Sequence, residues 1–147
     1  MTADPLVFSF FNEIGIIDQL IGTMLTNALP CGMTKAQFTV LNHFVRLDLL
    51  DKSPAALAEA FQVRRPTITS TLARMEAAGL IAIRLDPKDG RAKLVSITAA
   101  GREMRERCVD ALQIMIPMMD SVVTDPEIRE LLPVLHKIRA GLDNLRK

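Results

Sequence analysis

The chain has 147 residues, a formal net charge of +1 and 49% hydrophobic residues, which is enough for one domain with its own core. It contains six Phe and neither Trp nor Tyr, so it lacks the aromatic surface on which single-strand and RNA-binding proteins stack bases. No uninterrupted run of about 18 apolar residues occurs, and no basic segment precedes the first apolar stretch, so we expect neither a membrane span nor a signal peptide.

The first predicted element is a helix over residues 5–28, in which apolar side chains recur every three or four residues. The turn-forming sequence Pro-Cys-Gly at residues 30–32 ends it. Thr34 and Gln37 then stand three residues apart, which is the spacing of a capping box, so a second helix is predicted from there to about Leu47. The residues expected to face inward from this helix are Phe38, Leu41 and Phe44.

Two short helices with a tight break between them are predicted over residues 53–78. Ser53 is a good N-cap, and Pro54 suits the first helical position, where a missing N–H costs little. After the break at residues 62–65, Pro66 again stands near the start of a helix. The apolar residues of this second helix recur at i, i+4 and i+7 and share one face: Ile68, Leu72 and Met75.

The opposite face of the second helix is small, polar and basic. It carries Thr67, Ser70, Ala73, Arg74 and Ala77, with Thr69 on the flank. Small hydroxyl side chains let a helix lie deep in a major groove, whereas bulky side chains would hold it away from the base edges. The two helices and this face fit the geometry of a helix-turn-helix, in which the second helix reads DNA.

A β-hairpin is predicted directly after these helices. An apolar strand from Leu80 to Leu85, the polar loop Asp86–Arg91 (DPKDGR) and an alternating strand from Ala92 to Ile97 give the pattern, and Thr98 opens another helix. The tip and edge of the hairpin are basic, with Arg84, Lys88, Arg91 and Lys93. Such a hairpin is what a winged helix-turn-helix uses to touch a DNA groove.

Positive charge is concentrated in this part of the chain. Residues 62–94 contain seven Lys and Arg against three Asp and Glu, a net of +4, so the rest of the chain sums to −3. A basic patch on a nearly neutral protein is the electrostatic footprint expected of a protein that binds double-stranded DNA.

Two more helices are predicted toward the C-terminus. One runs from Thr98 to Pro117, where a kink or break is expected, and its apolar residues are Met104, Cys108, Leu112 and Met115. The other starts at Thr124, and its stripe is Ile128, Leu131, Leu132, Leu135, Ile138 and Leu142. Residues 1–29 and 102–147 are more apolar than a small core can cover, so we expect them to cover each other across the two-fold axis of a homodimer.

The sequence resembles the MarR family of bacterial transcription regulators. The resemblance is carried by the run VRRPTITSTLARMEAAGLI from Val63, by Asp89 and Arg91 in the hairpin loop, and by Ile97 and Thr98 after it. It extends over nearly the whole chain in length and in the order of elements. Two positions depart from the family pattern: Ile97 replaces the usual Leu, and Arg64 stands where many members have a Ser that caps the second helix.

The resemblance implies a mainly α fold with a small β-hairpin, a winged helix-turn-helix over residues 34–101 and dimerisation helices over residues 1–29 and 102–147, all within one domain. It implies that Asp89 orients Arg91. It also implies control by a small molecule, often phenolic or anionic, in the cleft between the DNA-binding region and the dimer helices. The expected protein is a cytoplasmic repressor that needs no cofactor.

The predicted DNA contacts lie in three segments. The N-terminus of the helix at Thr34 and Lys35 is expected to hold a backbone phosphate. The second helix of the helix-turn-helix should enter the major groove, and Arg91 should reach an adjacent minor groove with two lysines near phosphates. The residues of these two elements are Arg64, Arg65, Thr67, Thr69, Ser70, Arg74, Lys88, Arg91 and Lys93.

Two other functions remain open from the sequence. Cys31 is the one thiol placed for sensing, so the scaffold could serve as a redox-sensing regulator; Cys108 is expected to be buried and unreactive. A winged helix can also bind protein instead of DNA. The two Cys and two His lie too far apart along the chain for a metal site, and no paired carboxylates or Gly-rich phosphate loop indicate an enzyme.

Overall fold

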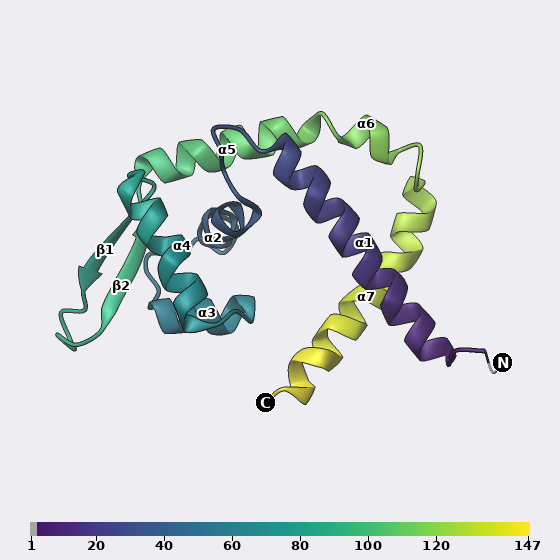
Figure 1. Ribbon diagram of the computed structural model, residues 1–147, viewed down its shortest axis with the longest axis horizontal. Coiled ribbons are helices and arrows are strands. Elements are labelled where there is room, and N and C mark those ends of the chain that lie inside the picture. The colour runs from purple at the N-terminus through teal and green to yellow at the C-terminus, as the bar shows by residue number, and fades with distance from the viewer. Residues whose placement is uncertain (1–2) are drawn as a thin grey trace. The chain divides into compact units, whose positions relative to one another are not determined.

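Figure 1 shows a computed structural model of the chain, in which residues 3–147 are described. The elements of this part are α1 (Leu6–Ala28), α2 (Lys35–Arg46), α3 (Pro54–Phe61), α4 (Arg65–Ala77), β1 (Ile81–Leu85), β2 (Lys93–Ile97), α5 (Ala99–Gln113), α6 (Ile116–Met119) and α7 (Asp125–Leu145). The fold is therefore mainly α with one two-stranded antiparallel hairpin, as predicted. The chain divides into two compact units, one up to Leu112 and the other from Gln113 onward.

Local capping sets the starts of α2 and α3. At α2, the Thr34 hydroxyl accepts from the Gln37 N–H at 3.1 Å, and the Gln37 side chain accepts from the Thr34 N–H at 3.1 Å, which confirms the predicted capping box. At α3, Ser53 accepts from the Ala56 N–H at 3.1 Å. These bonds satisfy N–H groups that have no partner within the helix, so each helix begins where its sequence signal stands.

The core of the first unit lies between α2, α3, α4, the hairpin and α5. The predicted stripe of α4 is confirmed, because Ile68, Leu72 and Met75 are all buried. Against it pack Leu41 and Phe44 of α2, which were expected to face inward, together with Leu57, Val95 and Cys108. Burial of these side chains is the main force that holds the helix-turn-helix together.

The hairpin has a fixed register and is fastened at its base. Ile81 stands opposite Ile97, Ile83 opposite Val95 and Leu85 opposite Lys93. The Thr98 N–H donates to the Leu80 carbonyl at 3.1 Å at the open end. On the far side of β2, Lys52 exchanges two backbone hydrogen bonds with Val95, at 2.9 and 2.8 Å. The segment before α3 thus extends the hairpin by one residue pair.

The helix after the hairpin ends earlier than predicted. Thr98 caps α5 by accepting from the Gly101 N–H at 3.0 Å, but α5 stops at Gln113 instead of continuing to Pro117. Pro117 belongs to the short helix α6, and Met115 precedes that helix instead of continuing the stripe of α5. A proline ring clashes with the carbonyl four residues before it, which here is that of Gln113, so the helix breaks at that residue.

The helices α1 and α7 contain no buried residue within the described part of the chain. In α1, Leu6, Phe8 and Leu20 are exposed, and in α7 Leu131, Leu135 and Leu142 are exposed. By length and composition alone, α1 is apolar enough to cross a membrane, a property that core helices of soluble proteins share. The expectation of no membrane span therefore cannot rest on its composition.

Candidate DNA interface

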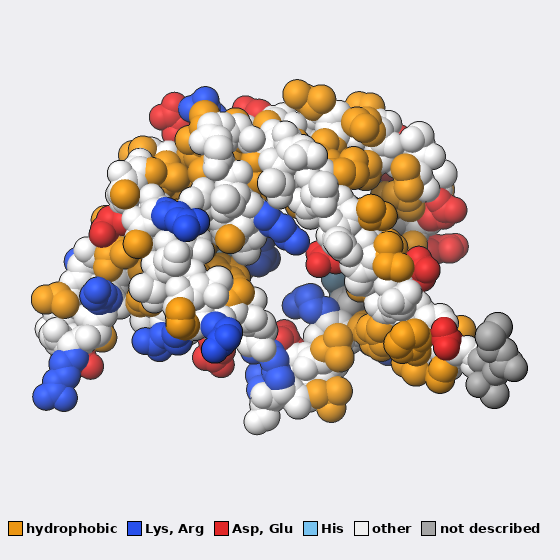
Figure 2. Space-filling view, in the orientation of Figure 1, with side chains coloured by type: hydrophobic (Ala, Val, Ile, Leu, Met, Phe, Trp, Pro, Cys, Tyr) orange, Lys and Arg blue, Asp and Glu red, His pale blue; other side chains and the backbone are white. Residues whose placement is uncertain are grey.

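The face of α4 opposite the core is exposed along its whole length. Thr67, Ser70 and Arg74 lie on it and are exposed, as predicted from the periodicity, and Thr69 on its flank is exposed as well. Lys and Arg side chains gather over α3 and α4 and at the tip of the hairpin (Figure 2, blue). The helix thus presents short hydroxyl side chains with cations beside them.

The first turn of α4 has no side-chain cap. Arg64 occupies the N-cap position with extended backbone, and its side chain makes no capping hydrogen bond. Pro66 lacks an N–H, so the amides of Arg65 and Thr67 are those left for solvent or another partner. The departure from the family pattern at Arg64 therefore removes the cap and leaves an exposed guanidinium at the start of the helix.

The loop of the hairpin is folded by its two aspartates. Asp86 Oδ1 accepts from the Lys88 N–H at 2.9 Å, and Asp89 Oδ1 accepts from the Arg91 N–H at 3.1 Å. The Asp89 carboxylate therefore holds the backbone of Arg91, and the structure shows no ion pair between the two side chains within residues 3–147. This arrangement fixes where the side chains of Lys88 and Arg91 leave the loop, and both are exposed.

Arg84 differs from the other cations of the hairpin. Its Nη2 lies 2.8 Å from Asp51 Oδ2, with both side chains partly exposed. The pair connects β1 to the segment before α3, and the carboxylate offsets the charge. Within residues 3–147, the exposed cations of the hairpin that form no ion pair are Lys88, Arg91 and Lys93.

A groove of about 560 Å³ lies between α4 and the hairpin. Arg65 and Thr69 line it from α4, and Arg91 and Lys93 line it from the hairpin, so four of the predicted residues share one surface. Glu76, a carboxylate that the sequence analysis did not single out, lines the same groove and accepts from the Ile83 N–H at 3.0 Å.

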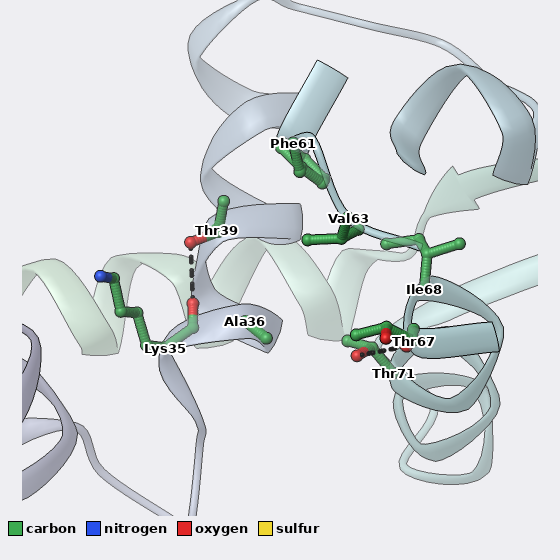
Figure 3. A pocket seen from close by; sticks show the side chains of 8 residues that line it. All are labelled: Lys35, Ala36, Thr39, Phe61, Val63, Thr67, Ile68 and Thr71. Carbon is green, nitrogen blue, oxygen red and sulfur yellow. Dashed lines mark hydrogen bonds between the residues drawn. The ribbon is translucent and has the colours of Figure 1, made fainter. Parts of the chain in front are cut away.

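Thr34 and Lys35 lie apart from this groove. Lys35 Nζ is 3.4 Å from Asp18 Oδ1 of α1, and the exposed fractions of the two side chains are 47% and 76%. A second cavity of about 360 Å³ is lined by Lys35, Ala36 and Thr39 of α2, by Phe61 and Val63, and by Thr67, Ile68 and Thr71 of α4 (Figure 3). The ammonium group of Lys35 points away from the α4 residues of this cavity.

Cys31 lies in the turn after α1 with a φ of 57°, and its thiol is exposed. Arg107 Nη2 lies 3.1 Å from its Sγ. Cys108 is buried, as predicted. Burial raises the pKa of its thiol, and the nearby Cys31 raises this pKa further. Within residues 3–147, no three His, Cys, Asp or Glu side chains gather in a way that would hold a metal ion.

Comparison with known proteins places this geometry in context. A model of the MarR family matches residues 32–92. The transcriptional activatory protein BadR of Rhodopseudomonas palustris is 31% identical over 117 residues, which are 79% of this chain and 66% of BadR, so the matched part spans about two thirds of that relative.

Solved structures extend the likeness to nearly the whole chain. The transcriptional regulator BldR from Sulfolobus solfataricus has a TM-score of 0.81 and 26% identity, with 96% of this chain and 99% of BldR covered. A mutant MarR from E. coli, solved in complex with operator DNA, shares the fold with a TM-score of 0.77 and 24% identity, over 92% of this chain and 99% of that one.

Proposed function

This chain belongs to the MarR family of DNA-binding transcription regulators, and we propose that it acts as a cytoplasmic homodimer that represses transcription from a palindromic operator. The groove between α4 and the hairpin carries this proposal. It brings Arg65, Arg91 and Lys93 together beside the uncharged Thr69. Cations that neutralise phosphates, next to short side chains that can reach base edges, are the two components of sequence-specific duplex binding.

The two elements divide the work by their chemistry. The exposed face of α4 enters the major groove, where Thr67, Thr69 and Ser70 contact base edges or methyl groups and Arg64, Arg65 and Arg74 add charge. The hairpin reaches the adjacent minor groove through Arg91, which Asp89 orients through the backbone, with Lys88 and Lys93 near phosphates. Thr34 and Lys35 hold a further phosphate once Lys35 leaves Asp18.

The exposed apolar helices support the homodimer. Contiguous apolar surface of this kind marks an interaction site on a soluble protein, and both α1 and α7 carry it. A two-fold dimer sets its two reading helices about 34 Å apart, one turn of DNA, and therefore requires a pseudo-palindrome. We propose repression because a dimer bound across a promoter would block transcription. Activation is the alternative, since the relative BadR is named a transcriptional activatory protein.

We propose that a small phenolic or anionic effector controls binding. The cavity in Figure 3 is one place in the described chain where a small apolar molecule would touch Thr67 directly. The alternative control is oxidation of Cys31, favoured by its exposure and by the adjacent Arg107 guanidinium. Thermal shifts with a panel of phenolic acids, and alkylation of Cys31 in the native protein, separate the two kinds of control.

The test is selection of bound genomic DNA, followed by titration of the selected operator with the variant Arg91→Ala. We expect the variant to lose about 1–3 kcal/mol of binding free energy while remaining a folded dimer. Arg102→Ala, which removes an exposed cation from α5, is the matched control and should bind as the wild type does. An unchanged dissociation constant for Arg91→Ala at moderate salt would remove the hairpin from the interface, and absence of duplex binding at low salt would favour a protein-binding module instead.

A further inference from the structure

One carboxylate lies in the otherwise basic groove between α4 and the hairpin. Glu76 stands in the last turns of α4, seven residues after Thr69 and eleven after Arg65, on the stripe of the helix that lines the groove. On charge alone, a carboxylate at this position would repel a phosphate backbone. Its geometry indicates another role, because its Oε2 accepts from the Ile83 N–H of β1 at 3.0 Å.

The register of the hairpin explains why this N–H is available. Val95 uses both its N–H and its carbonyl for Lys52, so Val95 and Ile83 form a non-hydrogen-bonded pair of the antiparallel ladder. The N–H of Ile83 therefore points away from β2, toward the open edge of β1. Glu76 supplies a partner for this edge group, and the ionised acceptor makes the bond charge-assisted.

Besides apolar packing against the core, the other polar side-chain and bridge contacts of the hairpin join it to its own base or to the segment before α3. The bonds of Thr98 join its base to Leu80 and Gly79, and the Lys52–Val95 and Arg84–Asp51 contacts join it to the segment before α3. Within residues 3–147, the bond from Ile83 to Glu76 is the only hydrogen bond that joins a side chain of α4 to a strand of the hairpin. It holds β1 at its middle residue, beyond the base.

We propose that Glu76 is a positioning residue for DNA recognition. Its bond to Ile83 fixes the separation and tilt of the hairpin relative to α4, so that Arg91 meets the minor groove while Thr69 and Ser70 face the adjacent major groove. A two-stranded hairpin is only marginally stable in isolation, so an anchor at mid-strand restrains the end that carries the cations. This inference rests on the proposed function, because it requires α4 and the hairpin to contact one operator together.

Three substitutions separate the bond from the charge. Glu76→Ala removes both, Glu76→Gln keeps an acceptor oxygen and loses the charge, and Glu59→Ala is the matched control. Glu59 is an exposed carboxylate of α3 whose side chain makes no hydrogen bond within the described residues, so its removal changes only charge. We expect Glu76→Ala to weaken operator binding about tenfold, whereas Glu76→Gln and Glu59→Ala bind at least as tightly as the wild type. Binding to random DNA should not fall in any of them.

A double-mutant cycle with Arg91→Ala shows whether Glu76 acts through the hairpin. In the Arg91→Ala background, Glu76→Ala should cost nothing further, because the contact that it positions is already lost. Amide exchange at Ile83 should accelerate in Glu76→Ala and stay slow in Glu76→Gln, and binding is compared at a temperature at which every variant is folded.

Two results would overturn the inference while leaving the proposed function intact. One is operator binding by Glu76→Ala equal to that of Glu59→Ala, which would leave Glu76 with a charge effect alone. The other is additivity of Glu76→Ala and Arg91→Ala. Failure of the wild-type protein to bind any duplex would instead refute the proposed function itself, and with it the role of Glu76.

Discussion

The winged-helix region (residues 34–101) and the terminal helices use the same kinds of side chain in opposite ways. Phe44 and Leu72 are at most 1% exposed in the core of that region. Phe8 of α1 is 57% exposed, and Leu142 of α7 is 50% exposed. The winged-helix region buries a core of its own, although Leu50 and Leu85 at its surface stay exposed, whereas α1 and α7 contain no buried residue within residues 3–147. The difference indicates that internal packing stabilises the winged-helix region, whereas the apolar faces of α1 and α7 are the surfaces that we assign to the proposed dimer.

Truncation tests this division most severely. Deletion of residues 1–28, or of residues 124–147, should give aggregated or monomeric protein without specific DNA binding, because each deletion removes one apolar surface of the proposed dimer. Size-exclusion chromatography with light scattering gives the oligomeric state, and a gel shift gives the binding. A soluble truncated monomer with full operator affinity would break the comparison.

A Gly→Ala substitution at one position in each region tests the same contrast between a packed region and an exposed helix. A Cβ on Gly101 would collide with the Leu80 carbonyl oxygen and lie 2.8 Å from Ile97 Cγ1, so Gly101→Ala should lower the free energy of unfolding by about 1–3 kcal/mol. Gly141 of α7 has nothing within 4 Å of such a Cβ, and Gly141→Ala should raise helix stability by about 0.5–1 kcal/mol. Urea denaturation measures both. An equal loss at Gly141 would show that a partner packs against α7 there.

Within the winged-helix region, we expect α4 to determine sequence specificity and the hairpin lysines to determine the salt dependence of binding. Ser70→Ala should reduce the difference in binding affinity between operator and random DNA. It should leave the salt dependence of binding nearly intact, because Ser70 is uncharged and lies on the exposed face of α4. Lys88→Ala should weaken binding to both DNAs alike and lower the slope of log K against log salt by about 1. Fluorescence anisotropy over a salt series measures both. Equal weakening of operator and random DNA by Ser70→Ala would contradict the role of α4.

The smallest expected effect concerns pH. Burial of His43 against Phe61, together with the charges of Arg46 and Lys52, lowers its pKa below the ordinary value of 6.5. The unfolded chain therefore binds this proton more readily, so the contribution of His43 to stability is complete above pH 6.5 and is lost as the pH falls through its lowered pKa. In His43→Gln, the midpoint temperature of thermal unfolding should depend less on pH across this window. Substitution of the exposed His136 is the control, and an unchanged pH profile in His43→Gln would contradict the prediction.

Sequence reasoning was most successful where the signal is local. The capping box at Thr34, the cap at Ser53 and the spacing of Ile68, Leu72 and Met75 each depend on residues within two turns of one another, and all three predictions are confirmed. The hairpin and its loop follow equally local rules.

Contacts between distant elements were not predictable in the same way. The Arg84–Asp51 pair spans 33 residues, and the bond between Glu76 and Ile83 depends on which backbone groups β1 leaves unpaired. The unpaired groups follow from the register that places Ile83 opposite Val95, and only the folded structure brings Glu76 to that edge of β1. A carboxylate on the stripe of α4 that faces a basic hairpin was the available signal for Glu76, but the sequence does not tell which side of α4 the hairpin occupies.

The helix α5 is fastened at three points along its length. Gly101 lies against the base of the hairpin, Arg105 donates to the Asn42 side chain of α2 at 3.2 and 3.1 Å, and Arg107 meets Cys31 in the turn before α2. Because α5 contacts all three elements, it cannot move relative to one of them without disturbing its contacts with the others. We therefore expect a shift of α5 to move the hairpin and α2 together. DNA affinity should then be lost in one cooperative transition and not in several independent steps.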